Sequence, residues 1–183
     1  SGPSGVGKGT IIKMVKDKYN IPISISHTTR KKREGEIEGI DYYFVDNDNF
    51  FEMVDSKKFI EWEQVHDNYY GTHVLNLEKI KSSNLLFEID VNGAVNLMNR
   101  IKSNNGKYIS IFLDAPSKDE LINRLILRGS ETEETIKIRM NTAEHELSQK
   151  KHFDYIVVND TISSAFSRVE EILKQEGVLQ DEA

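Results

Sequence analysis

Apolar and polar residues recur with two different periods along this chain, and these periods predict its helices and strands. Apolar residues at helical spacing from Ile11 to Val15 predict a first helix over about residues 8–19. The same pattern, with capping residues, predicts further helices over residues 48–57, 75–83, 95–101, 116–128, 133–150 and 162–175. Short apolar or alternating runs predict strands over residues 21–26, 40–45, 59–63, 85–90, 108–113 and 155–158.

The order of these elements predicts an α/β fold. Strands at 85–90, 108–113 and 155–158 alternate with helices, which is typical of a parallel sheet with helices on both faces. Residues 26–83 are richer in short strands and aromatic residues, so we expect them to form an inserted lobe. The polar helix over 133–150 has few large apolar residues and is interpreted as a mobile flap.

The first ten residues fit the phosphate-binding loop pattern G-x-x-x-x-G-K-[ST] in all but its last slot. Three glycines let the backbone N–H groups converge on phosphate oxygens, and Lys8 adds an ammonium group. The helix that begins there would point its positive end at the same anion. Gly9 takes the slot usually filled by a magnesium-binding hydroxyl, which arrives one residue later as Thr10. Such a loop normally follows a buried strand, so we expect one before Gly2.

Length, composition and charge restrict the class of protein further. The chain has 183 residues, which suits one domain, and its 38% hydrophobic and 30% charged residues are ordinary for a globular protein. The net charge of −6 argues against nucleic acid as the main partner. The absence of cysteine fits a reducing compartment, the histidines show no metal spacing, and no apolar run reaches the roughly 18 residues of a membrane span. We expect a soluble, cytoplasmic protein.

Arginine is scarcer than lysine in this chain, yet it is concentrated in two stretches. One holds Arg30 and Arg33, and the other holds Arg124, Arg128 and Arg139. Because arginine binds phosphate bidentately and lysine does not, the clusters predict two further phosphate-handling surfaces. The alternative for the first cluster is a solvated basic loop. The alternative for the second is a set of i,i+4 ion pairs, and each such pair contributes only tenths of a kcal/mol to stability.

Acidic residues mark two other candidate positions. Glu88 and Asp90 end the apolar run at 85–90, and paired carboxylates at a strand end commonly serve Mg²⁺, a base or an arginine clamp. Glu61 has large apolar neighbours in its predicted strand. A carboxylate there is either an outward-facing residue or a specific acceptor.

Six segments, in this order, together resemble guanylate kinase: the loop, S-x-T-T-R-x-x-R (26–33), G-x-D-Y-x-F (39–44), F-I-E-W (59–62), N-Y-Y-G-T (68–72) and R-G-x-E-T-E-E (128–134). The resemblance covers essentially the whole chain. It implies a P-loop NTPase-like parallel sheet in one domain, 1–183, with a core (about 1–25, 84–118 and 153–183), an inserted mixed α/β GMP-binding lobe (26–83) and a helical lid (119–152). It also implies a monomeric nucleoside monophosphate kinase that transfers the γ-phosphoryl group of Mg-ATP to GMP or dGMP, with Mg²⁺ as cofactor and no nucleic-acid or membrane partner.

The resemblance further implies roles for individual residues. For ATP these are Gly2, Ser4, Gly5, Val6, Gly7, Lys8, Gly9, Thr10, Arg124, Arg128 and Asn159. For GMP they are Ser26, Arg30, Arg33, Tyr42, Glu61, Tyr70, Thr72, Glu88 and Asp90. The catalytic set would be Lys8, Arg33, Arg124, Arg128 and Arg139, and the metal would be held by Thr10 and Asp90.

The chemistry of guanine agrees with the role of Glu61. Guanine presents N1–H and N2–H₂ side by side, which suits one carboxylate, whereas adenine would leave Glu61 unpaired at a cost of roughly 1–3 kcal/mol.

Three positions depart from the family pattern: Gly9, Glu88 in place of Asp, and Asn92 in place of Gln.

Two other functions stay open from the sequence. One is a guanylate-kinase-like module that binds phosphopeptides and has lost catalysis, against which the intact loop and distal arginines argue. The other is a nucleoside monophosphate kinase with a different base preference, which Gly9 suggests and which Glu61 and Thr72 oppose.

Overall fold

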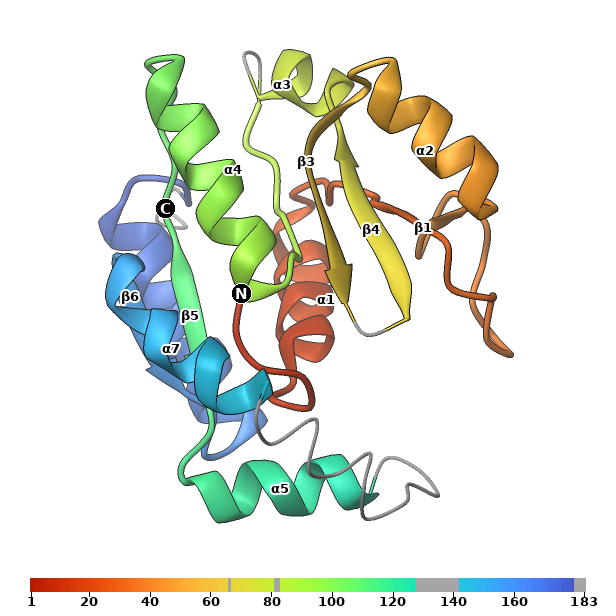
Figure 1. Ribbon diagram of the computed structural model, residues 1–183. Helices are drawn as coiled ribbons and strands as arrows, with labels where there is room; N and C mark the ends of the chain where they lie inside the picture. Colours follow the sequence, from red (N-terminus) through yellow and green to blue (C-terminus); the bar gives the residue numbers. More distant parts are fainter. Residues whose placement is uncertain (66, 81–82, 128–141, 180–183) are drawn as a thin grey trace. The chain divides into compact units, whose positions relative to one another are not determined.

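The computed structural model describes residues 1–65, 67–80, 83–127 and 142–179 (Figure 1). They fall into two compact units, and each is described here by itself. The first unit comprises Ser1–Asn20, Glu88–Val91 and Lys107–Ala183, and the second comprises Ile21–Phe87 and Asn92–Gly106. The predicted division into core, lobe and lid stays a prediction.

The first unit is built around two parallel strands. β5 (Ile111–Asp114) and β6 (Tyr155–Val158) pair in register from Ile111 opposite Tyr155, and Leu113 N–H donates to the Ser1 carbonyl beyond them. Helices α1 (Lys8–Tyr19), α5 (Lys118–Leu127) and α7 (Ile162–Gln175) belong to the same unit. A helical stretch at 142–148 is followed by a 3₁₀ turn, η1 (Gln149–His152).

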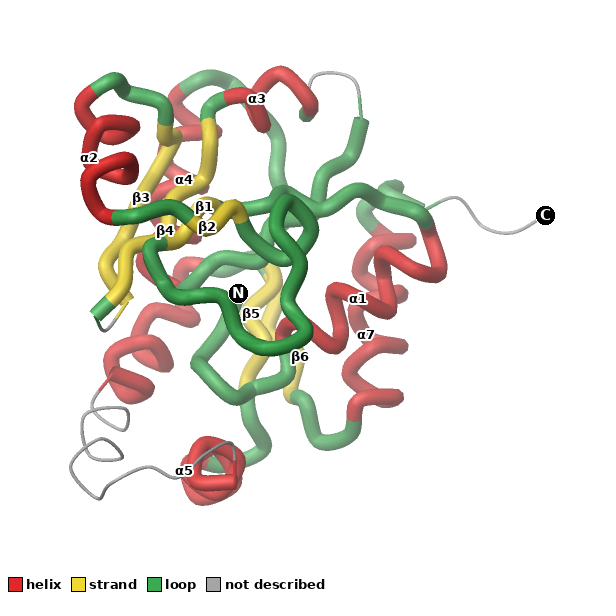
Figure 2. Tube along the Cα trace, turned by 90° about the vertical axis from the view of Figure 1, so that its right-hand side faces the viewer, coloured by secondary structure: helices red, strands yellow, loops and turns green. Residues whose placement is uncertain are grey.

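Helices α1 and α7 pack side by side (Figure 2), and Lys18 at the end of α1 pairs with Glu170 of α7. The Thr161 hydroxyl accepts the Ser164 N–H at 3.2 Å and thereby caps the start of α7. Ala165, Val169 and Leu173 are buried at four-residue spacing and form the apolar stripe of the helix. The sequence pattern predicted this helix because its period and its cap agree.

The second unit holds a four-stranded sheet in the order β2-β1-β4-β3 (Figure 2). Its strands are β1 (His27–Thr28), β2 (Tyr43–Phe44), β3 (Phe59–Val65) and β4 (Asn68–His73). β4 runs antiparallel to both β1 and β3, and β1 runs parallel to β2. The helices of this unit are α2 (Asn47–Asp55), α3 (Leu75–Lys79) and α4 (Val91–Ser103, whose first residue belongs to the other unit).

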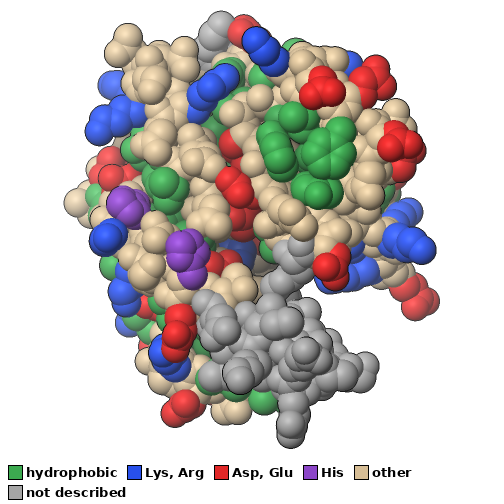
Figure 3. Space-filling model, viewed as in Figure 1, with side chains coloured by type: hydrophobic (Ala, Val, Ile, Leu, Met, Phe, Trp, Pro, Cys, Tyr) green, Lys and Arg blue, Asp and Glu red, His purple; other side chains and the backbone are tan. Residues whose placement is uncertain are grey.

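Aromatic side chains form the core of this second unit. Phe50 of α2 is completely buried, and its ring lies 4.8 Å from that of Phe59 and 5.8 Å from that of Tyr69. Phe51 and Trp62 remain partly exposed with their rings 6.1 Å apart, and Figure 3 shows apolar side chains gathered on this face. These contacts fix β3 and β4 against α2, and both strands carry residues of the candidate site.

Several predicted elements match the structure closely, and others are corrected. The predicted bounds of α1, β6 and α7 are confirmed. The predicted strands at 21–26 and 85–90 are wrong, because their only β pairing is a single bridge between Ile23 and Leu86. Pro22 lacks an N–H for a longer ladder. Of the helix predicted at 133–150, residues 133–141 lie outside the described residues. None of the described helices has the length and apolar character that crossing a bilayer requires.

Candidate active site

The loop at residues 1–7 is shaped by glycines that no other residue could replace. Gly2 has φ of 147°, and a Cβ atom there would lie 2.2 Å from the carbonyl oxygen of Leu113. Gly7 has φ of 96°, and its Cβ would lie 2.6 Å from Asn159 Nδ2. The close approach of β5 and Asn159 therefore requires glycine at both positions. The loop therefore depends on glycine for its positive φ angles and for its close contact with Leu113 and Asn159.

The start of α1 has the features of a candidate anion-binding position. Gly7 caps the helix without a side-chain acceptor, and the first turn carries no acidic residue. The first-turn N–H groups therefore give the helix a positive end directed at the loop. The Lys8 ammonium donates to the carbonyl oxygens of Gly2 at 2.6 Å and Pro3 at 3.0 Å, so it folds back over the loop.

Asn159, which follows β6, holds the loop at residues 1–7 through a side-chain hydrogen bond. Its side chain is 2% exposed and donates to the Val6 carbonyl at 2.7 Å, across 153 residues of sequence. Arg124 in turn donates to the Asn159 carbonyl at 3.2 Å, while its Nε pairs with Glu120 at 2.9 Å. The i,i+4 ion pair expected as the alternative for Arg124 is thus present, together with a contact to the residue that supports the loop.

Gly9 and Glu88 are neighbours in the first unit. A Cβ atom on Gly9 would lie 3.6 Å from both carboxylate oxygens of Glu88, which is ordinary van der Waals contact. The Glu88 carboxylate therefore stands where a side chain at position 9 would project. Thr10 is exposed one residue later.

In the second unit, β3 and β4 bring Glu61 and Thr72 together. The two residues are direct partners in the antiparallel register, after an irregularity between Phe59 and Glu61. Glu61 is 8% exposed and Thr72 is 1% exposed. Within the described residues, the buried Thr72 hydroxyl has no hydrogen-bond partner. A buried hydroxyl left unpaired costs about 1–3 kcal/mol, so this hydroxyl is a candidate to bind a ligand or an ordered water.

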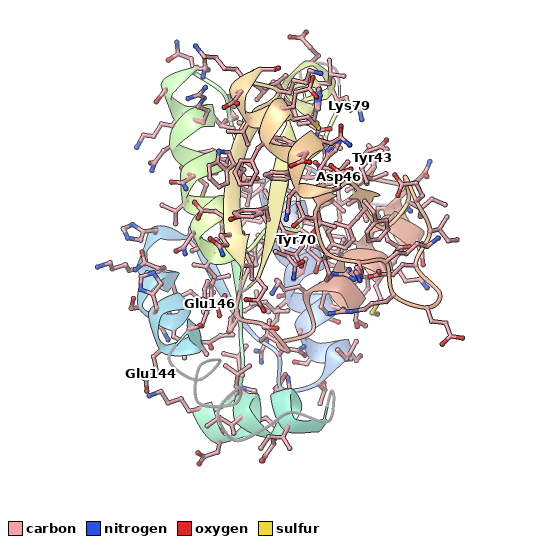
Figure 4. The ribbon with its side chains drawn as sticks, turned by 45° about the vertical axis from the view of Figure 1, so that its right-hand side comes forward. Tyr43, Asp46, Tyr70, Lys79, Glu144 and Glu146 are labelled. Carbon is pink, nitrogen blue, oxygen red and sulfur yellow. The ribbon has the colours of Figure 1, made fainter. Side chains whose placement is uncertain are left out.

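The predicted phosphate-binding residues of the second unit are also brought together. The Arg30 guanidinium lies 5.3 Å from the ring of Tyr42, whose centroid is 5.9 Å from that of Tyr70. Ser26 directly precedes β1 and accepts the Tyr43 N–H through its carbonyl at 2.9 Å. Figure 4 shows Tyr70 on β4 within this unit.

Glu36 is a site residue that the sequence reasoning missed. Its carboxylate accepts hydrogen bonds from both Arg30 Nη atoms, at N···O distances of 3.0 and 2.6 Å, and from the Arg33 backbone N–H at 2.7 Å. The Arg30 hydrogen bonds hold the pKa of the Glu36 carboxyl below its usual range. In the sequence, the one indication of this role was that Glu36 lies six residues after Arg30. The two side chains come into contact only because the loop between them folds back. Arg33 itself is exposed.

Some predicted site residues cannot be placed. Arg128 and Arg139 lie outside the described residues, so Arg124 is the one member of the distal arginine cluster that has a described position. Among the described residues there is no group of three His, Cys, Asp or Glu side chains arranged for a metal ion.

A sequence model of the guanylate kinase family matches residues 1–176. The chain belongs to the guanylate kinase family. It is 43% identical over 182 residues to a guanylate kinase of Mycoplasma mobile, covering 96% of this chain and 90% of that one. It is 44% identical over 178 residues to one of Prochlorococcus marinus strain MIT 9312, covering 95% and 94%. The crystal structure of guanylate kinase from Anaplasma phagocytophilum matches with a TM-score of 0.74 at 33% identity, over 98% of this chain and 84% of that one.

These matches confirm the family resemblance and the α/β fold of the P-loop NTPase type. The roles of single residues stay predictions. Membership of the guanylate kinase family indicates that these residues should serve phosphoryl transfer to a nucleotide.

Proposed function

We infer that this protein is an enzyme that transfers the γ-phosphoryl group of ATP to GMP or dGMP, giving ADP and GDP or dGDP. The observation that carries this function is the buried pair of Glu61 and Thr72 in a chain of the guanylate kinase family. Among the described residues the Thr72 hydroxyl has no hydrogen-bond partner. Guanine N1–H and N2–H₂ would donate to the Glu61 carboxylate. The Thr72 hydroxyl would gain the partner that it lacks.

The GMP phosphate would be held by the cluster around Arg30. Guanidinium groups and phenol hydroxyls are suitable hydrogen-bond donors to phosphate oxygens. Arg30 already donates two hydrogen bonds to one carboxylate, that of Glu36. A phosphate group would compete with that carboxylate for the same donors. The residues proposed for this role are Ser26, Arg30, Arg33, Tyr42 and Tyr70.

The ATP phosphates would bind at the loop and at the positive end of α1. Lys8 would exchange its contacts with the Gly2 and Pro3 carbonyls for phosphate oxygens. Arg124, together with Arg128 and Arg139, would neutralise charge on the transferring group. We propose that Asn159, besides supporting the loop, borders the adenine.

Mg²⁺ is the cofactor that we propose to accompany ATP. The oxygen atoms of Thr10, Glu88 and Asp90 are chemically suitable, because Mg²⁺ prefers oxygen ligands and usually keeps several waters. The Glu88 carboxylate lies 3.6 Å from the position that a Cβ atom at residue 9 would take. It is therefore a candidate for the oxygen that the loop lacks at that slot. Bound there, Mg²⁺ would offset the charge of the β- and γ-phosphates.

The residues of this chain would act by positioning and charge neutralisation. An oxygen of the GMP phosphate attacks the γ-phosphorus, a new P–O bond forms to GMP, and the bond to the ADP oxygen breaks. Lys8 and the arginines would offset the charge shared among the transferring oxygens. Glu61 and Thr72 would hold the acceptor in line for attack, which is the main contribution that such a reaction needs.

A coupled ADP-release assay tests this function directly. The protein is given Mg-ATP with GMP, dGMP, AMP, UMP or no acceptor, and we expect ADP release only with GMP or dGMP. Turnover with AMP would indicate a kinase of different base preference. GMP binding without turnover would favour the phosphopeptide-binding module, which a titration with phosphopeptides would then test.

A further inference from the structure

Glu36 connects the two arginines of the first basic stretch. Its carboxylate accepts two hydrogen bonds from the Arg30 guanidinium, at 2.6 and 3.0 Å, and one from the Arg33 backbone N–H at 2.7 Å. Its own backbone N–H donates to the Arg33 carbonyl at 3.2 Å. Gly35, with φ of 83°, provides the left-handed residue of this turn. One acidic side chain therefore closes the loop that carries both arginines.

The Arg30 residue is held at both of its ends. Its backbone N–H donates at 3.1 Å to the hydroxyl of Thr28, a completely buried residue of β1. Its guanidinium carbon lies 5.3 Å from the ring centroid of Tyr42 and 5.8 Å from that of Phe44. Only 13% of the Arg30 side chain and 18% of the Glu36 side chain are exposed. Because solvent screens such a pair weakly, Glu36 can fix the orientation of the guanidinium.

The hydrogen bonds of Arg30 use particular N–H groups. A guanidinium has five N–H donors in a fixed, planar fork. Glu36 takes one donor from Nη1 and one from Nη2, and the Lys31 carbonyl takes the other donor of Nη1 at 2.9 Å. Neither residue uses the Nε–H or the second N–H of Nη2. These two N–H groups are parallel and lie along one edge of the guanidinium, which matches two oxygens of a phosphate.

A phosphate group that approaches Arg30 competes with Glu36, and this competition has two possible outcomes. The phosphate can displace the carboxylate, or it can bind the edge formed by Nε and Nη2 and leave the carboxylate in place. The second outcome keeps all three hydrogen bonds that the Glu36 carboxylate accepts. A guanidinium between two anions also attracts both of them, which offsets their mutual repulsion. The second outcome is therefore the more favourable one.

We propose that Glu36 is a positioning residue for the acceptor nucleotide, because it holds one edge of the Arg30 guanidinium and thereby presents the Nε–Nη2 edge to the phosphate of GMP. This role rests on the proposed function, which takes GMP as the ligand of the cluster. Glu36 acts through Arg30 and does not itself contact the phosphate. Its contribution is preorganisation: without it, Arg30 must be ordered during binding, and affinity for GMP falls.

The test compares Glu36→Gln with Glu34→Gln in the whole protein. Glu36→Gln keeps the size of the side chain but places an N–H₂ group where a carboxylate oxygen now accepts. Glu34→Gln makes the same change of charge at an exposed residue of the same loop. Calorimetry measures the dissociation constants for GMP and for guanosine, which lacks the phosphate. Circular dichroism and urea unfolding verify that both variants are folded.

We expect Glu36→Gln to bind GMP about tenfold more weakly and to bind guanosine like the unchanged protein. Glu34→Gln should bind both ligands like the unchanged protein. In steady-state assays the KM for GMP should rise by a similar factor in Glu36→Gln, with little change in kcat or in the KM for ATP. This difference between GMP and guanosine is one that general damage to the fold would not produce.

Two further variants separate positioning from charge. Glu36→Asp keeps the charge but shortens the reach to Arg30, so positioning predicts weaker GMP binding, whereas an effect of charge alone predicts no change. Arg30→Lys removes the planar fork. In that background, Glu36→Gln should weaken GMP binding by less than about twofold, because the group that Glu36 orients is absent.

Three results would overturn the proposal. Tighter binding of GMP by Glu36→Gln would show that the carboxylate is a competitor that GMP displaces. Equal losses for GMP and guanosine would show that Glu36 serves the loop in general, and additive effects of Glu36→Gln and Arg30→Lys would show that it does not act through Arg30. GMP binding without turnover in the unchanged protein would refute the proposed function, while the comparison of variants would still decide the role of Glu36.

Discussion

Glu61 lies opposite Thr72 in the antiparallel pairing of β3 and β4, and both side chains are buried. A buried hydroxyl is costly unless it is paired, and Thr72 Oγ1 has no partner among the described residues. The aromatic contacts of Phe59 and Phe50 fix this arrangement behind them. The base preference of the enzyme should therefore depend on these two residues more than on any other pair.

Replacing Glu61 by Gln should reduce guanine selectivity. The amide presents an N–H₂ group toward one of the guanine donors, so one favourable contact becomes a repulsive one. We expect kcat/KM for GMP to fall about 10- to 100-fold, with a much smaller change for AMP. The measurement is the coupled ADP-release assay with both acceptors. Glu52→Gln, on the exposed side of α2, is the matched control, and unchanged discrimination in Glu61→Gln would contradict the assignment.

Replacing Thr72 by Val should have opposite effects on stability and on binding. The hydroxyl has no hydrogen-bond partner within the described residues, so its loss should leave the free energy of unfolding unchanged or raise it by about 1 kcal/mol. If the hydroxyl pairs with guanine, the same change should raise the KM for GMP several-fold. Urea unfolding and acceptor titrations measure the two quantities. A destabilised variant with unchanged KM would show that the hydroxyl serves the fold instead.

Exchanges at Gly9 and Glu88 should be coupled. Glu88→Asp shortens the carboxylate that stands beside Gly9, so the Mg²⁺ concentration for half-maximal activity should rise several-fold. Adding Gly9→Ser supplies a hydroxyl in the same space and should restore part of the loss. A double-mutant cycle on Mn²⁺ binding in the presence of ADP, followed by electron paramagnetic resonance, measures the coupling directly. Additive effects of the two changes would show that the residues act independently.

His27 should make the protein sensitive to acid. Burial, and next the neighbouring His73, lower the pKa of His27 to about 4, below the 6.5 expected for an exposed histidine. Its ring stacks on Tyr43 with centroids 4.8 Å apart. Because the folded pKa is depressed, the unfolded chain binds the proton first. The contribution of His27 to stability is therefore present above about pH 6.5 and is lost as the pH falls toward 4.

The variant His27→Phe keeps the ring stacking and removes the titration. We expect the unchanged protein to lose more unfolding free energy than His27→Phe between pH 7 and pH 4.5, because only the unchanged protein must bury a charged His27 as the pH falls. Urea unfolding at both pH values is the measurement. His152→Phe alters an exposed histidine and should behave like the unchanged protein. Parallel pH curves for His27→Phe and the unchanged protein would refute the assignment.

The sequence by itself determined the features that depend on neighbouring residues. The loop from Gly2 to Lys8, the helix after it and the capped helix α7 follow from local spacing, glycine positions and a capping hydroxyl. Glu61 was singled out by its apolar neighbours, whereas Thr72 and the guanine-binding role of both residues came from the family resemblance. The predicted strand at 85–90 failed because a strand exists only where a neighbour pairs with it, and Leu86 makes a single bridge.

Only the tertiary structure decided which polar groups are paired and which are not. Asn159 donates to Val6 across 153 residues, Glu36 pairs with Arg30, and the Thr72 hydroxyl finds no partner in the part of the chain that the structure describes. Glu144 pairs with Lys118, 26 residues earlier in the sequence, which no local pattern indicates. The physical reason is that burial and hydrogen bonding over long sequence distances arise from packing, which no local pattern records.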